Sequence, residues 1–465
     1  LVHIMADGTI GKGVAADWNI SDDGLTYTFK LRNNSHWAMF SGHKAVLGEN
    51  YEDTFDITVK AEGFKFGIER TLSEQTGSAD APLFSAVKSI STPDDFTIVF
   101  NLSYADDNFL YALTNPGAMP CDEEFFNLTN GKYGLDAKYL LCNGPFHVSK
   151  WTEKTSVKLA KNNEYNGESS VSPSSVTFYI NNDDSEVADK MNSVTYDVAF
   201  LSSSQFSSIE NKKDLNSVAV QNVTYSFIFN QNDNNYRNKN MRLAFCRSCD
   251  TSSLFDSQSD ISKADGIVPP SCKIGGEDYR NGNAAELLSY DETLAKKNFN
   301  DALLELGSSS VETTILCTEQ YEPFVKQMVQ KLQKTLGVKF VSTVKVVSES
   351  DLEAAVNDGN YSVAFYPFKA KSSFAGEIIE GFDQNNIFGY ESDVLSQKIR
   401  NIKNNSGSLE GERSAVADAE NYLVSEAVIM PVFYENSYFV TSKKTSGIYF
   451  YSSADNVCFI NAKKS

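Results

Sequence analysis

The sequence predicts a mixed α/β chain of more than one domain, in which a β-rich segment comes first and two α/β segments follow. Three observations lead to this prediction. The length of 465 residues corresponds to about three domains, at roughly 150 residues each. Apolar and polar residues alternate over residues 25–32, which is the period of a half-buried strand. Between residues 295 and 366, helical and strand periods succeed one another, as they do in βαβ units.

The first 120 residues are expected to be rich in strands. Residues 22–24, Asp-Asp-Gly, form a turn signal, so an upstream strand is expected to pair with residues 25–32 across it. A helix is expected over residues 61–72, because large apolar residues recur there at every fourth position. Residues 97–100 are short and apolar and indicate another strand.

From residue 143 the pattern changes to a mixture of strands and helices. The pattern is clearest within residues 295–366, where the order is helix, strand, helix, strand and where Gly337 and Gly359 end the two helices. A strand, a helix and a second strand with short connections predict a parallel pair with a right-handed crossover. The expected strands are residues 157–159, 176–180, 196–201, 338–346, 361–366 and 428–434, and the expected helices are residues 324–336, 351–356 and 412–425.

The charge balance excludes some classes of function. Lysine plus arginine number 41 and aspartate plus glutamate 61, which gives a formal net charge of −20. A nucleic-acid-binding protein needs a basic surface to displace counterions from phosphate, and docking on anionic lipid needs one as well. Hydrophobic residues make up 41% of the chain, enough for a sizeable core. No apolar run approaches the roughly 18–20 residues of a membrane span.

The motifs of common enzyme classes are missing from the sequence. It has no phosphate-binding loop and no G-x-S-x-G nucleophile motif, and no two of its four histidines stand four residues apart. We therefore expect no catalytic residue, no metal ion and no cofactor. A binding protein is favoured over an enzyme.

Cys246 and Cys249 form a C-x-x-C pair. A redox dithiol or half of a zinc site is one interpretation, and a disulfide that involves one of the two is another. A zinc site needs a second pair of ligands, which Cys272 alone does not supply. We favour the interpretation that both cysteines are helix positions, with one of them facing the core.

A series of short motifs runs through the chain. Residues 13–32 contain glycine, alanine and tryptophan, followed by S-D-D-G-L-T-Y-T-F-K-L-R. Residues 143–146 read N-G-P-F, and Trp151 and the N-N-E-Y of residues 162–165 follow them. Residues 427–434 read A-V-I-M-P-V-F-Y. Taken in this order, the motifs resemble those of the family 5 extracellular solute-binding proteins, the peptide- and dipeptide-capturing receptors of ABC importers.

The resemblance implies a two-lobed class II periplasmic-binding-protein fold with an additional β-rich accessory domain. Lobe I would comprise residues 1–20, 143–236 and 437–465, the accessory domain residues 21–142, and lobe II residues 237–436. A ligand would lie in the cleft between the lobes, and its contacts to both lobes would favour the closed form.

The resemblance also points to the strand over residues 361–366 as one wall of this cleft. In peptide-binding members, this strand leads to an aspartate that pairs with the free amino terminus of the ligand. Lys369 stands at the corresponding position here. A lysine would repel an ammonium group and attract a carboxylate, a phosphate or a sugar oxygen, or it would point outward and take no part.

Aromatic and amide side chains complete the expected site. The aromatic residues form either a box around the ligand or ordinary core packing. They are Tyr225, Phe229, Phe365, Tyr366 and Phe368. Asn385 and Asn386 resemble an asparagine-containing turn of the family, and their amides either contact the ligand or cap the turn.

These observations lead to the hypothesis of a non-catalytic substrate-binding subunit of an ABC importer. It would capture a short peptide at the extracellular face of the cell membrane or in the periplasm and deliver it to the permease. A monomer is expected, and the resemblance implies a lipid anchor upstream of residue 1. An oligosaccharide is the alternative ligand within the family, and a secreted hydrolase is the alternative of a different class.

Overall fold

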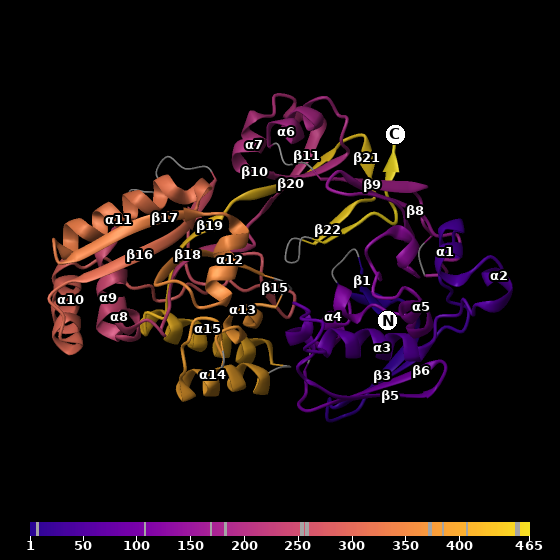
Figure 1. Ribbon diagram of the computed structural model, residues 1–465, viewed down its shortest axis with the longest axis horizontal. Helices are drawn as coiled ribbons and strands as arrows, with labels where there is room; N and C mark the ends of the chain where they lie inside the picture. The colour runs from indigo at the N-terminus through magenta and orange to yellow at the C-terminus, as the bar shows by residue number, and fades with distance from the viewer. Residues whose placement is uncertain are drawn as a thin grey trace.

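The chain forms three parts that surround a central opening in the view of Figure 1. We name them the N-terminal part (residues 1–142), the small-sheet part (residues 143–220 and 437–465) and the six-stranded part (residues 223–435). The computed structural model describes residues 1–5, 9–106, 108–167, 170–180, 184–251, 255, 260–370, 374–383, 386–405, 408–451 and 456–465.

The N-terminal part is built on an antiparallel sheet in the order β3-β4-β6-β5. The alternation along β4 buries Tyr27 and Phe29 and leaves Lys30 exposed. α3 has the expected bounds and packs on this sheet through Phe64 and Ile68, both fully buried. The elements are β1 (Val2–Ile4), β2 (Ile10–Lys12), β3 (Ala15–Ile20), β4 (Thr26–Leu31), α1 (Lys44–Leu47), α2 (Tyr51–Thr54), α3 (Ala61–Leu72), β5 (Val87–Asp94), β6 (Thr97–Leu102), α4 (Phe109–Ala112) and α5 (Glu123–Leu128).

The small-sheet part contains two three-stranded antiparallel sheets, in the orders β7-β8-β9 and β10-β20-β11. The strands expected over residues 157–159, 176–180 and 196–201 are confirmed as β8, β9 and β10. β20 joins this part from the far end of the chain, as the yellow strand in Figure 1 shows. The elements are β7 (Phe146–Thr152), β8 (Ser156–Lys161), β9 (Ser175–Tyr179), α6 (Asp184–Asn192), β10 (Val198–Ser202), α7 (Ser203–Ser208), β11 (Leu215–Val220), β20 (Ser437–Ser442), β21 (Thr445–Ser446), β22 (Tyr449–Tyr451), β23 (Asn456–Cys458) and β24 (Lys463–Lys464).

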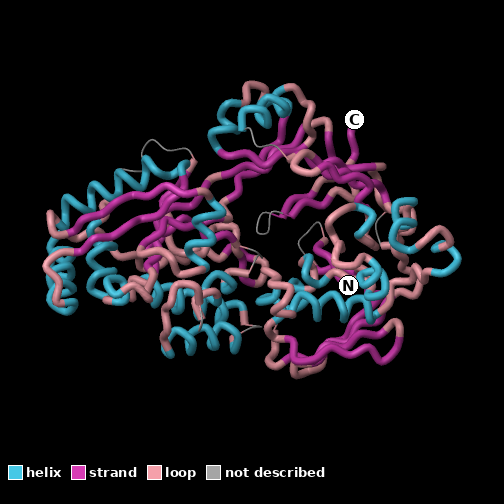
Figure 2. The backbone as a smooth tube through the Cα atoms, in the orientation of Figure 1, coloured by secondary structure: helices cyan, strands magenta, loops and turns pink. Residues whose placement is uncertain are grey.

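A mixed sheet in the order β13-β19-β12-β18-β16-β17 forms the centre of the six-stranded part. Helices cover both of its faces, as Figure 2 shows. Phe227 and Phe229 of β12 join one core cluster and Ile228 joins the other, because successive side chains of a strand point to opposite faces. The elements are β12 (Val223–Phe229), α8 (Asn234–Arg237), α9 (Lys239–Ser248), β13 (Ile261–Lys263), β14 (Lys273–Ile274), β15 (Glu277–Asp278), α10 (Glu292–Leu306), β16 (Val311–Thr318), α11 (Glu322–Leu336), β17 (Phe340–Val347), α12 (Glu349–Asn357), β18 (Val363–Lys369), α13 (Gly376–Glu380), α14 (Asp393–Asn404), α15 (Leu409–Ser425) and β19 (Ile429–Glu435).

The βαβ prediction for the six-stranded part is correct in strand direction and wrong in pairing. β17 and β18 are parallel, but they are not hydrogen-bonded to each other, because β16 lies between them and pairs in parallel with both. The sequence did not predict β16. In its first half, buried residues alternate with Glu312 and Thr314, so its apolar signal is weaker than that of its neighbours. The parallel pair joined by a single helix is therefore β16 and β17, with α11 between them in the chain.

Strand pairing assigns two strands differently from the expected boundaries. β3, expected in lobe I, pairs with β4 in the sheet of the N-terminal part. β12, also expected in lobe I, lies between β19 and β18 in the six-stranded sheet. The chain therefore enters the six-stranded part after β11, at residues 221–222, and leaves it before β20, at Asn436. The three-part division as a whole remains a proposal.

Candidate ligand-binding site

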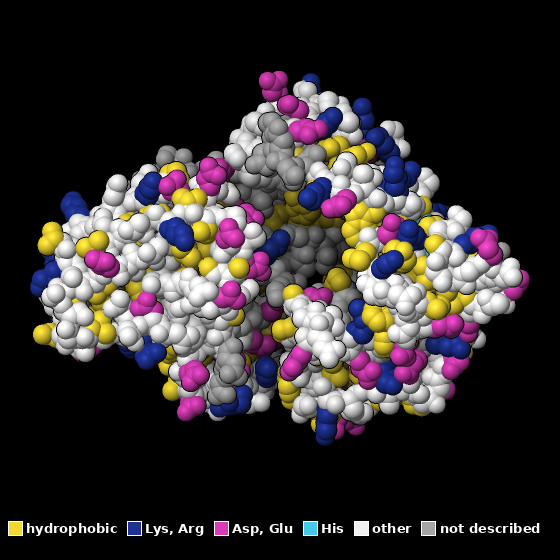
Figure 3. Space-filling model, viewed as in Figure 1, with side chains coloured by type: hydrophobic (Ala, Val, Ile, Leu, Met, Phe, Trp, Pro, Cys, Tyr) yellow, Lys and Arg dark blue, Asp and Glu magenta, His cyan; other side chains and the backbone are white. Residues whose placement is uncertain are grey.

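A cavity of about 740 Å³ lies between the N-terminal part and the six-stranded part. Residues from 79 to 115 form one side of it, and residues from 353 to 412 form the other. Figure 1 shows α13 and α4 facing each other at this boundary, and Figure 3 shows the hollow in the centre of the molecule above it. Its volume lies within the range that small-molecule sites occupy.

The end of β18 supplies an aromatic wall of the cavity. Tyr366 and Phe368 line it, and both are partly exposed. Behind them, the ring of Phe368 stacks on Phe382 at 5.7 Å, and Phe382 stacks on Phe388 at 4.7 Å. Since Phe382 and Phe388 are buried, they hold Phe368 in place. The wall is thus an apolar surface on a rigid support.

Lys369 is the last residue of β18, and its exposed side chain lines the same cavity. Its charge also acts on Glu435, the last residue of β19. Burial raises the pKa of Glu435, whereas the hydroxyl of Tyr321, which donates to Glu435 Oε1 at 2.6 Å, and the Lys369 ammonium lower it. Lys369 therefore stands beside the start of β12, near the connection at residues 221–222, and its charge acts on Glu435 as well as on the cavity.

Acidic side chains also line the cavity. Burial raises the pKa of Glu380, at the end of α13, to about 7, and Asp106 and Asp383 add to this effect. The positive charge of Lys403 lowers it in part, and Glu380 in turn raises the pKa of Lys403. Its Nζ donates to the hydroxyl of Tyr104 at 3.3 Å and lies 4.9 Å from the centre of that ring. This contact joins the two sides of the cavity.

The asparagine turn has a structural role. The side chain of Asn386 donates to the carbonyl oxygens of Phe382 and Asp383 and accepts from the backbone N–H groups of Phe388 and Tyr390. Asn386 lines the cavity, yet its amide is occupied by the turn that carries the aromatic wall. Asn385 lies outside the described residues.

Three of the expected aromatic residues lie in the core of the six-stranded part and do not line the cavity. Phe229 is fully buried and Phe365 is 1% exposed. Tyr225 is partly buried and packs against Tyr321 and Phe433, with ring centres 4.4 and 5.0 Å apart. Of the five expected aromatic residues, only Tyr366 and Phe368 line the cavity, because helices cover both faces of the sheet at the other three positions.

Both cysteines of the C-x-x-C pair are buried. Cys246 lies in α9 and Cys249 directly follows it, and both side chains belong to the core. Burial raises the pKa of Cys246 to about 12 and also raises the pKa of Cys249, which disfavours the reactive thiolate. The sequence led us to expect two helix positions with one cysteine facing the core, whereas both cysteines lie in the core and Cys249 follows the end of the helix. Within the described part of the chain, no group of three or more His, Cys, Asp and Glu side chains is placed to hold a metal ion.

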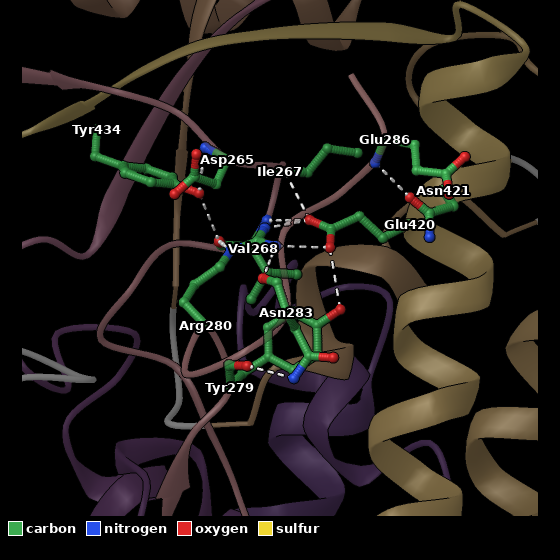
Figure 4. A network of polar contacts seen from close by, with 10 residues as sticks. All are labelled: Asp265, Ile267, Val268, Tyr279, Arg280, Asn283, Glu286, Glu420, Asn421 and Tyr434. Atoms are coloured by element: carbon green, nitrogen blue, oxygen red, sulfur yellow. Dashed lines mark hydrogen bonds and ion pairs between the residues drawn. The ribbon is translucent and has the colours of Figure 1, made fainter. Parts of the chain in front are cut away.

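Another buried acid of the six-stranded part, Glu420, is fully paired, as Figure 4 shows. Glu420 of α15 accepts hydrogen bonds from the N–H groups of Ile267 and Val268, at 2.7 and 2.9 Å, and from the hydroxyl of Tyr279 at 3.0 Å. Arg280 adds a bidentate ion pair. This network anchors the long connection between β13 and α10 onto α15.

Sequence comparison decides the family of the chain. The sequence profile described as bacterial extracellular solute-binding proteins, family 5 Middle, matches residues 9–388, which is most of the chain. The chain belongs to the family 5 extracellular solute-binding proteins. A family 5 member is a binding protein and not an enzyme, so the hydrolase alternative is set aside.

Related proteins fit this assignment. The dipeptide-binding protein DppE of Bacillus subtilis is 22% identical over 458 residues, which cover 94% of this chain and 80% of DppE. The oligopeptide-binding protein SarA of Streptococcus gordonii is 27% identical over 248 residues, but these cover only 48% of this chain and 35% of SarA. Within the described residues, no helix is long and apolar enough to cross a membrane.

Solved structures of similar proteins confirm the fold. OppA of Listeria monocytogenes, bound to peptide, has a TM-score of 0.81 at 21% identity, and the alignment covers 100% of this chain and 92% of OppA. The binding protein AgaA of A. tumefaciens R10, in complex with agropinic acid, has a TM-score of 0.78 at 17% identity, with 100% and 92% covered. The mixed α/β fold of the family therefore extends over the whole solute-binding chain.

Tyr104, Glu380 and Lys403 of the cavity were not anticipated from the sequence. Tyr104 belongs to the N-terminal part, whereas Glu380 and Lys403 belong to α13 and α14 of the six-stranded part. None of them lies in a motif, and no local spacing marks them. Only the contact between two distant parts of the chain brings them together.

Proposed function

We propose that this chain is the substrate-binding subunit of an ABC importer and that it captures a short peptide and delivers it to the membrane permease. The observation that carries the proposal is the relationship to DppE, a dipeptide-binding protein, over 94% of this chain. The family acts outside the cell. An attached lipid, which the resemblance places ahead of residue 1, would hold a monomer at the outer face of the membrane.

The cavity supports this proposal by its size and its chemistry. Its volume of about 740 Å³ suits a few amino-acid residues. Tyr366 and Phe368 offer apolar surface for side chains, and Lys369 offers a positive charge for a carboxylate, such as the carboxyl terminus of a peptide. In this proposal Lys369 contacts the ligand, which reverses the charge that the family resemblance led us to expect at this position.

Closure of the parts around the ligand would supply the capture step. Only two connections, at residues 221–222 and at Asn436, join the six-stranded part to the small-sheet part. The two connections touch, since Gln221 Nε2 donates to Asn436 Oδ1 at 2.7 Å and to Ser262 Oγ at 2.8 Å. A paired hinge of this kind permits rotation of one part against the other, and a ligand that contacts both sides favours the closed form.

The test is mass spectrometry of small molecules released when the freshly purified protein is denatured, followed by calorimetric titration with mixed tri- to pentapeptides. Released peptides, or micromolar binding of the peptide mixture, support the proposal. Hexose-spaced masses would favour an oligosaccharide, for which the aromatic wall of Tyr366 and Phe368 is also suited. A single other metabolite, or no binding of any peptide to the emptied protein, would refute peptide capture.

A further inference from the structure

The charges in the cavity are strongly unbalanced. Among the described residues, six acidic side chains and two lysines line it. The acidic residues are Asp106, Glu353, Glu377, Glu380, Asp383 and Glu412, and the lysines are Lys369 and Lys403. Lys369 lies at the end of β18, whereas Glu377 and Glu380 lie in α13, where the charges of Asp106, Glu377 and Asp383 also act on Glu380.

Glu380 is the group in this cluster whose burial is only partly compensated, by the charge of Lys403. In the part of the chain that the structure describes, its carboxylate accepts no hydrogen bond and forms no ion pair, although burial raises its pKa to about 7. Lys403, whose charge acts on Glu380, donates its hydrogen bond to the hydroxyl of Tyr104. A partly buried anion without a partner is costly, and the cost falls when a ligand supplies the missing positive charge.

The surroundings of Glu380 suit an organic cation better than a metal ion. The described acidic side chains of the cavity are not placed as a metal-binding group, and a cavity of about 740 Å³ is far larger than an ion requires. Tyr104, Tyr366 and Phe368 line the same space, and aromatic rings attract ammonium and guanidinium groups. The net charge of −20 also draws cationic ligands toward the protein.

From these observations we propose that the cavity selects peptides that carry an additional positive charge, which the carboxylate of Glu380 binds across the boundary between the N-terminal and six-stranded parts. This inference rests on the proposed peptide capture and names its substrate class. Lys369 would receive a carboxylate of the same peptide, so that two groups of the cavity bind opposite charges.

The test uses pairs of tri- to pentapeptides that differ only by lysine or norleucine at one position, titrated into the full chain by calorimetry. The unchanged protein should bind the best lysine peptide about tenfold more tightly than its norleucine partner, as expected for a hydrogen bond to a charged group. Glu380→Gln should abolish this preference while norleucine peptides bind as before. Glu312→Gln is the matched control, because Glu312 is exposed on β16 and does not line the cavity.

Each outcome separates the two proposals. Peptide binding without a preference for lysine overturns this inference and leaves peptide capture intact. A preference that persists in Glu380→Gln overturns the role of Glu380. Failure of every peptide to bind the unchanged protein overturns both proposals. Thermal unfolding of each variant shows whether it is folded, and Gln is close to Glu in size, so a folded variant is expected.

Discussion

Replacement of Glu380 by glutamine should stabilise the ligand-free protein by an amount that grows as the pH rises from about 4.5 to about 7. The pKa of Glu380 is about 7 in the folded chain, against an ordinary value of 4.5. Between these two values the folded state binds more protons than the unfolded state, so the free energy of unfolding decreases as the pH rises. Glutamine cannot ionise and therefore removes this decrease.

The size of the effect follows from the interval between the two pKa values. At about 1.4 kcal/mol for each pH unit, the interval from 4.5 to about 7 limits the destabilisation by ionised Glu380 to about 3 kcal/mol. Part of this interval lies below pH 5. Between pH 5 and pH 8, the advantage of Glu380→Gln over the unchanged protein should therefore grow by about 2 kcal/mol.

Urea unfolding of both proteins at pH 5, 6, 7 and 8, without ligand, measures this difference. The unfolding transitions of Glu380→Gln and of the unchanged protein should move further apart as the pH rises. Glu312→Gln, at an exposed position, should stay together with the unchanged protein at every pH. An advantage of the same size at every pH would contradict the reasoning, because it would show an effect of packing and not of ionisation. If Glu380→Gln were less stable than the unchanged protein at pH 8, the surroundings of Glu380 would stabilise its ionised form, and the reasoning would be wrong.

Three further predictions concern the hinge, the buried ion pair and Lys369. Glu420→Gln leaves Arg280 buried without its anion and should lower the free energy of unfolding by about 3–5 kcal/mol, measured by urea unfolding. Gln221→Ala removes the contact to Asn436, so small-angle scattering should show a broader distribution of sizes without ligand, while stability changes by only about 1 kcal/mol. Lys369→Gln should weaken the binding of peptides with a free carboxyl terminus about tenfold and leave amidated peptides unaffected, measured by calorimetry.

The regular elements were predictable where one face of an element is polar. α3 was expected over residues 61–72 and has those bounds, because apolar side chains recur on one face of an otherwise polar helix. β4 was predictable because apolar and polar side chains alternate along it, so that one face of the strand is polar. β16 was not, and the pairing of β17 with β18 was wrong as a result, because neighbours in a parallel sheet are set by tertiary packing and not by order in the chain.

The site was predictable only in part, for a different physical reason. The run of residues 363–369 reads the same whether its aromatic side chains face a ligand or a core, since a strand covered on both faces is apolar throughout. Phe365 is in the core, whereas Tyr366 and Phe368 reach the cavity. Glu380 and Tyr104 come from distant parts of the chain, so no local pattern could pair them.

Two glutamates of the six-stranded part, Glu420 and Glu380, differ in how the cost of their burial is compensated. Glu420 receives three hydrogen bonds from neutral donors and a bidentate ion pair from Arg280, so its burial is fully compensated. Glu380, in the described part of the same chain, receives no hydrogen bond or ion pair and keeps a raised pKa. The fold can thus satisfy a buried carboxylate where the role is structural. A carboxylate at the wall of the cavity that accepts no hydrogen bond within the described chain is the kind of group that would meet its partner in a ligand, as proposed above.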